Sequence, residues 1–223
     1  GRLSNKRLIK TIVMSNAYKR SSKFDKDNYQ IDPDNVYFWR MNEKRLEAEQ
    51  IRDSLLFVSG KLDGSHKNIS DFQTDIKNSG KELRKYITET KARSIYIPSL
   101  RDNKIEVLDI FDRPDNSLLN AERSVTTVST QALFLMNNDK IILLAEEEAK
   151  ALVEHNKKMG KTMPNILYRN NVNNVFLKFL GRPSNDEESK RAIDFITQDD
   201  NIQGNLAKFI QVVICTGEFR NVK

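Results

Sequence analysis

The sequence has few of the residues that build redox, metal and nucleophilic sites. Cys215 is the only cysteine, so the chain cannot form an internal disulfide or a thiolate metal cluster. The two histidines, His66 and His155, are too few for a three-histidine zinc site. The Cys-x-x-Cys-His motif of covalent haem is absent, as are glycine-rich phosphate-binding loops. We therefore expect no metal, haem, nucleotide or other cofactor in this chain.

Long apolar runs are also missing. No stretch approaches the roughly 18 consecutive apolar residues of a membrane-spanning helix, so we expect no membrane span. Hydrophobic residues make up 38% of the chain and charged residues 30%, which is polar but sufficient for a folded core. Helical spacing of apolar residues begins at Leu8 and Ile9, without a signal-peptide pattern before it. We interpret the chain as a C-terminal piece of a longer protein.

The formal net charge is +6, with 37 lysines and arginines against 31 acidic residues. A basic balance can indicate nucleic acid, an acidic polysaccharide or an anionic surface as a partner. The basic residues are interspersed with acidic ones, however, and this is typical of solvated helix faces. Nucleic acid is therefore not the partner that we expect.

Apolar residues recur with the period of an α-helix along most of the chain. We predict a mainly α, single compact domain over 1–223 with long pinned loops and at most one small β element. The segment 21–35 reads as a loop, 93–98 as an extended strand, and 104–111 as a short helix or a strand, with the helix favoured. The other predicted helices are 5–16, 42–59, 81–90, one through 131–136, 139–158, 164–180, 186–196 and 205–216.

Acidic, basic and amide side chains recur in the turn at 32–40 and along the helix at 42–59. General acid–base catalysis would need two carboxylates that converge on one substrate, and sequence spacing does not show convergence. The favoured alternative is that these side chains tie loops to helices, so we assign no catalytic residue and no metal ligand. The candidate cluster, structural or ligand-binding, comprises Asp32, Asp34, Asn35, Arg40, Arg45, Glu49, Asp53, Arg123 and Gln131.

Three consecutive aromatic residues precede Arg40. Aromatic faces can stack on a sugar or a base, but large apolar side chains also anchor loops in a core. We favour Phe38 and Trp39 as anchors of the loop. Cys215 shares an apolar stripe with Ile210 and Ile214, so we expect a buried, inert thiol.

Several strings occur in a characteristic order, the longest being RLEAEQIRDSLLFVSGKLD at 45–63. The others lie at 12–18, 32–40, 93–98, 110–115, 126–137, 179–184 and 216–219. Together they resemble the C-terminal domain of large, secreted, planctomycete-type proteins that also carry cytochrome-c-like domains, a domain of unknown function of the PSD-one type. The segment 60–91 departs most from this pattern, so we interpret 61–92 as a variable insertion.

The resemblance implies an extracytoplasmic parent, periplasmic or secreted, with a haem domain elsewhere in its polypeptide. It supplies no catalytic residues. We therefore expect a non-catalytic structural or interaction module whose partners are other domains of the parent. The alternative is a binding or hydrolytic domain that acts on acidic polysaccharides, with an acidic glycan as the partner.

Overall fold

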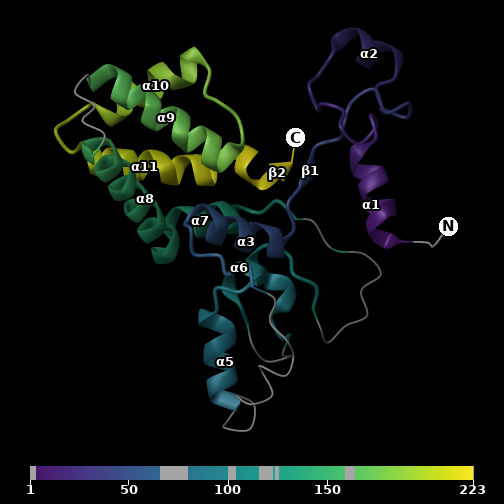
Figure 1. The fold of residues 1–223 in the computed structure, drawn as a ribbon, viewed down its shortest axis with the longest axis horizontal. Helices are drawn as coiled ribbons and strands as arrows, with labels where there is room; N and C mark the ends of the chain where they lie inside the picture. The colour runs from purple at the N-terminus through teal and green to yellow at the C-terminus, as the bar shows by residue number, and fades with distance from the viewer. Residues whose placement is uncertain are drawn as a thin grey trace. The chain divides into compact units, whose positions relative to one another are not determined.

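The computed structural model describes residues 4–65, 80–99, 104–115, 123, 126–158 and 164–222. Within these ranges the chain is mainly α-helical with one two-stranded sheet, as the sequence predicts (Figure 1). It divides into a small unit, Gly1–Leu46 with Arg220–Lys223, and a large unit, Glu47–Phe219. We describe each unit by itself, and the assignment of 1–223 to one domain stays a prediction.

The small unit contains two helices and both strands. In chain order these are α1 (Asn5–Met14), α2 (Lys26–Ile31), β1 (Lys44–Arg45) and β2 (Asn221–Val222). The two strands are antiparallel, and the Leu46 N–H continues the ladder by donating to the Arg220 carbonyl over 2.8 Å. The sequence predicts no helix at 21–35, and this is wrong, because the Asp25 carboxylate caps α2 by accepting from the Asn28 N–H.

The large unit carries the other described helices. These are α3 (Ala48–Val58), α5 (Gly80–Glu89), the 3₁₀ turn η1 (Ser94–Tyr96), α6 (Glu106–Ile110), α7 (Ser129–Asn137), α8 (Asp139–Lys158), α9 (Pro164–Leu180), α10 (Asp186–Ile196), α11 (Ile202–Cys215) and the 3₁₀ turn η2 (Glu218–Arg220), which leads into β2. The helices predicted at 81–90, 139–158, 164–180 and 186–196 are confirmed, as is the short helix within 104–111. Part of the predicted insertion, 66–79 with His66, lies outside the described residues.

Helix α3 begins later than the sequence predicts. Residues 44–45 pair as a strand, and Glu47 becomes the N-cap residue, with its N–H donating to Gln50 Oε1 over 2.9 Å. The helix ends at Val58, close to the predicted 59, and Gly60 follows with a left-handed φ of 66° that favours glycine. Gly181, with a φ of 71°, follows the end of α9 in the same way.

The segment at 93–98 does not form the predicted strand. It forms η1 instead, because the carboxylate of Asp53 on α3 accepts hydrogen bonds from both the N–H and the hydroxyl of Ser94. The backbone of this segment is therefore bound to a helix side chain rather than to a neighbouring strand. One isolated parallel bridge joins Asp63 to Ala92 just before it.

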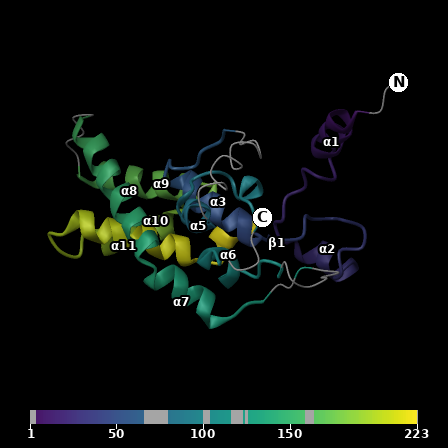
Figure 2. The ribbon, with the colours of Figure 1, turned by 90° about the horizontal axis from the view of Figure 1, so that it is seen from below.

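The core of the large unit lies where α11 packs against α8, α9 and α10 (Figures 1 and 2). Ile210 and Ile214 on α11 are fully buried there. Cys215, predicted to be buried, is only partly buried. Helix α3 contributes Ile51, Leu55 and Val58 to the buried apolar set, whereas Leu46, before the helix, is only partly buried. These residues place α3 against η1 and α6.

We predict that Ile51→Ala lowers the free energy of unfolding by about 2–5 kcal/mol, because the side chain is fully buried and its removal leaves a cavity. The matched control is Phe57→Ala on the same helix, where 69% of the residue is exposed. That change should stay within about 0.5 kcal/mol. Urea denaturation of both variants checks this, and equal losses would contradict the assignment of α3 to the core.

Candidate functional site

The loop at 32–42 in the small unit, here called the aromatic loop, is held together by one buried carboxylate. Asp32 is 7% exposed and accepts from the N–H groups of Val36 and Tyr37 over 2.9 and 2.8 Å. Its backbone carbonyl accepts from the Trp39 indole N–H over 2.8 Å. Sequence analysis selected Asp32 as a candidate, and the structure places it inside the loop rather than facing a cleft.

Asn35 closes the other side of the aromatic loop. Its side-chain amide donates to the Arg40 carbonyl and to Asn42 Oδ1, each over 2.9 Å. Asn35 and Phe38 have φ values of 54° and 53°, a left-handed conformation that asparagine tolerates and phenylalanine does not favour. The strained turn leaves Tyr37 and Phe38 81% and 67% exposed. The interpretation of Phe38 as a core anchor is therefore wrong, because the loop turns it outward.

Arg40 stacks on aromatic rings. Its guanidinium carbon lies 5.0 Å from the centre of the Trp39 ring and 5.7 Å from that of Phe24, within cation–π range. Within the described residues its buried Nε has no hydrogen-bond partner. Asp34 is exposed, and Arg45 lies in β1.

In the large unit, a buried arginine on α3 binds the segment after α5. The Arg52 guanidinium donates to the carbonyls of Ala92 and Thr90 and to the Ser94 hydroxyl, over 2.9, 2.5 and 3.1 Å. Burial lowers the pKa of Arg52, and the neighbouring Asp53 carboxylate opposes this shift. Arg52 and Asp53 together fix residues 90–94 against α3.

Glu49, one turn before Asp53 on α3, binds Arg123. Its carboxylate accepts two hydrogen bonds from the guanidinium, over 2.7 and 3.3 Å, and Glu47 lies 3.2 Å from the same group. Burial pushes the pKa of Glu49 upward, but the Arg123 hydrogen bond and charge hold the net pKa below its ordinary value. Glu49 is therefore held as a carboxylate by Arg123, 74 positions away in the sequence.

Gln131 on α7 is fully buried and binds the turn after α6. Its Nε2 donates to the Ile110 carbonyl over 3.0 Å and lies 3.3 Å from the Asp112 carboxylate. Asp112 in turn accepts from the N–H and the hydroxyl of Thr126. The candidate residues thus fall into both units. Most of those that have a described partner tie a loop to a helix or close a turn.

Sequence analysis missed the densest ion-pair network of the described residues. Arg182 donates to both oxygens of Glu218 over 2.6 and 2.8 Å and to both oxygens of Glu188 over 2.9 and 2.7 Å. It also lies 5.1 Å above the ring of Phe176. The hydrogen bonds that Arg182 donates to Glu218 and to Glu188 raise the pKa of Arg182. The strings at 179–184 and 216–219 contain Arg182 and Glu218, but they do not show that these residues pair, because 36 positions separate them.

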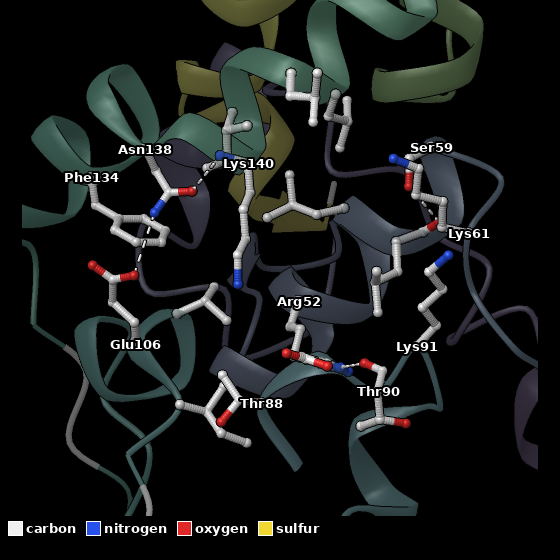
Figure 3. Close-up of a pocket in the computed structure, with 18 of the residues that line it drawn as sticks. Arg52, Ser59, Lys61, Thr88, Thr90, Lys91, Glu106, Phe134, Asn138 and Lys140 are labelled. Atoms are coloured by element: carbon white, nitrogen blue, oxygen red, sulfur yellow. Dashed lines mark hydrogen bonds between the residues drawn. The ribbon is translucent and has the colours of Figure 1, made fainter. Parts of the chain in front are cut away.

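A pocket of about 460 Å³ opens in the large unit between α3, the end of α5, α6 and the start of α8 (Figure 3). Its volume lies within the range of about 300–1,000 Å³ typical of small-ligand sites. Buried apolar side chains form part of its wall, namely Leu55, Ile105, Ile141 and Leu144. Four lysines also line it, namely Lys61, Lys91, Lys104 and Lys140. The sequence-derived candidates do not include this pocket.

In the part of the chain that the structure describes, no group of three or more His, Cys, Asp or Glu side chains could hold a metal ion. None of the described helices is both long and apolar enough to cross a bilayer.

The Arg182 network predicts a specific pH dependence. The Arg182 hydrogen bond lowers the pKa of Glu188 below that of the unfolded chain, so the carboxylate stabilises the fold above about pH 4. This contribution is lost as the pH falls through the lowered pKa. We predict that Glu188→Gln destabilises the chain at pH 6 and that its difference from wild type shrinks toward pH 3, measured by urea denaturation.

The control for this pH series is Glu187→Gln on the same helix, where the exposed carboxylate pairs with Arg191. An exposed pair of this kind contributes little, so its effect should stay within about 0.5 kcal/mol. A difference for Glu188→Gln that does not depend on pH would contradict the assignment.

Comparison with known proteins gives a family but no further relative. No curated protein and no solved structure matches the chain. The family model PSD1, described as a protein of unknown function (DUF1553), matches residues 1–196 of the 223. The match spans the small unit up to 46 and the large unit through α10. The chain therefore belongs to the PSD1 family of proteins of unknown function.

Proposed function

We propose that this chain is a non-catalytic interaction module of a larger extracytoplasmic protein that carries a haem domain elsewhere in its polypeptide. The observation that carries the proposal is that its candidate carboxylates already bind groups of the fold. Asp32 holds backbone N–H groups, Asp53 holds Ser94, and Glu49 holds Arg123. A general acid or base must face the substrate, and these three side chains face the fold. The extracytoplasmic address and the haem domain rest on the resemblance to secreted cytochrome-c-associated proteins.

The small unit supports an interaction role through its charge. It contains 13 lysines and arginines against 5 acidic residues, a net charge of +8. The large unit contains 24 against 26, a net charge of −2. The basic character of the chain therefore resides in the small unit. This concentration of charge favours an acidic partner surface.

The small unit also exposes an apolar helix face. On α1, which buries none of its residues, Leu8, Ile9, Ile12 and Val13 are 61%, 60%, 49% and 37% exposed. Contiguous apolar patches of this kind usually mark interaction sites. Lys6, Arg7 and Lys10 lie on the same helix. This combination fits another domain of the parent that presents apolar side chains within an acidic surface.

We predict that the remainder of the natural polypeptide, expressed separately, binds this chain and that Ile9→Asp with Ile12→Asp weakens binding at least about tenfold. The double change places two carboxylates in the apolar face that the partner would cover. The matched control is Leu177→Asp with Val212→Asp on the large unit, where both residues are more than half exposed. Analytical ultracentrifugation measures the affinity, and absence of binding or equal effects of the two variants would refute the proposal.

The second candidate is binding of an acidic polysaccharide, and the aromatic loop favours it. The loop presents Tyr37 and Phe38 to solvent beside Arg40, whose Nε lacks a hydrogen-bond partner within the described residues. Aromatic faces stack on sugar rings, and a guanidinium binds sulfate or carboxylate. A glycan could therefore use both groups at one loop.

One variant separates the two candidates. If Arg40 is structural, Arg40→Ala costs about 0.5–1 kcal/mol by removing the stacking on Trp39 and Phe24, and lowers the melting temperature. We predict this result, together with no binding of the wild type to sulfated or uronic polysaccharides on a glycan array. The control is Arg20→Ala, an exposed arginine of the same unit. Loss of glycan binding at an unchanged melting temperature would replace the first candidate with the second.

A further inference from the structure

Three lysines that are distant in the sequence line the pocket of Figure 3. Lys91 follows α5, Lys104 precedes α6, and Lys140 lies in the first turn of α8. The Lys140 side chain extends from α8 toward the middle of the pocket (Figure 3). Within the described residues, no carboxylate pairs with any of these three ammonium groups. Because like charges repel, three lysines that line one pocket favour the binding of an anion there.

The other charged groups of the pocket do not neutralise the positive charge of these three lysines. Lys61 is bound to Glu147 over 2.5 Å, and the Arg52 guanidinium is bound to backbone carbonyls. Two carboxylates also line the pocket. Glu106 accepts from the Asn138 side chain over 3.4 Å, and Glu89 is exposed at the end of α5. Five cations against two carboxylates leave a net positive lining.

Much of the rest of the wall is apolar, although Ser59, Thr88, Thr90 and Asn138 also line it. Leu55, Ile105, Ile141 and Leu144 are 9%, 6%, 3% and 7% exposed, so they form a closely packed apolar floor. Leu143, which also lines the pocket, is 51% exposed. A small inorganic anion would leave this apolar surface in contact with water, whereas an apolar body would cover it.

We propose that this pocket binds a small organic anion with an apolar body, of the class of medium-chain carboxylates. The lysines bind the carboxylate by charge-assisted hydrogen bonds, and the apolar floor takes the chain. A polysaccharide fits the pocket less well, because its hydroxyl groups would face the aliphatic floor without partners. This ligand class goes beyond the interaction role proposed above, which assigns nothing to the pocket.

Three probes separate the contribution of the ligand's charge from that of its apolar chain. Octanoate carries a carboxylate and an apolar chain, 1-octanol carries a similar chain without charge, and acetate carries the carboxylate without the chain. In isothermal titration calorimetry, octanoate should bind with a stoichiometry of one. Each of the other two should bind at least about tenfold more weakly, since each loses one of the two contributions. No binding of octanoate, or equal binding of octanol, overturns the proposal.

Two variants locate the binding. Lys140→Gln and Lys91→Gln, tested separately, should each weaken octanoate binding about tenfold, the loss expected for one charge-assisted hydrogen bond. The matched control is Lys208→Gln, an exposed lysine of α11 outside the pocket, which makes the same change in net charge. Each lysine is exposed, so thermal melts should show all three variants folded. Octanoate affinity that falls equally in all three, or in none, overturns the assignment to this pocket.

Discussion

The large unit depends on one buried cation. Arg52 on α3 is 7% exposed, and the carbonyls of Thr90 and Ala92 with the Ser94 hydroxyl satisfy its guanidinium. A buried charge is tolerated only when hydrogen bonds replace its water, so the position of α3 and the path of residues 90–94 constrain each other. The same contact places Lys91 between two bound residues, at the edge of the pocket. One helix side chain thus orders a loop and shapes a cavity wall.

Most of the candidate polar side chains identified in the sequence likewise bind a distant segment of the chain. Asp53 binds Ser94, Glu49 binds Arg123, and Gln131 binds the turn after α6. Each group brings together residues more than 15 positions apart, and Asp53 and Gln131 also satisfy backbone groups of irregular segments. The pocket, in contrast, has lysines without carboxylate partners among the described residues. This difference distinguishes side chains that hold the fold from those available to a ligand.

The helices could be predicted from sequence because their signals are local. Apolar spacing, Pro164 before α9 and the glycines after α3 and α9 give most boundaries correctly. Some failures have non-local causes, although the missed helix α2 has a local one, its Asp25 cap. The strand predicted at 93–98 could not be recognised as a 3₁₀ turn, because Asp53, about 40 positions earlier, binds it. The pocket was missed for the same reason, since its four lysines come from four separate segments and resemble ordinary surface charges in the sequence.

The exposed helix α1 has a thermodynamic consequence for the association proposed through its apolar face. It has ten residues, no side-chain N-cap bond and no buried residue, and isolated helices shorter than about 12–15 residues are marginal in water. Ordering α1 therefore draws on the free energy of the contact that covers its apolar face. Association through this face should show a negative change in heat capacity and an affinity lower than its buried area alone suggests. Such a contact is suited to reversible assembly, in which helix formation and docking occur as one event.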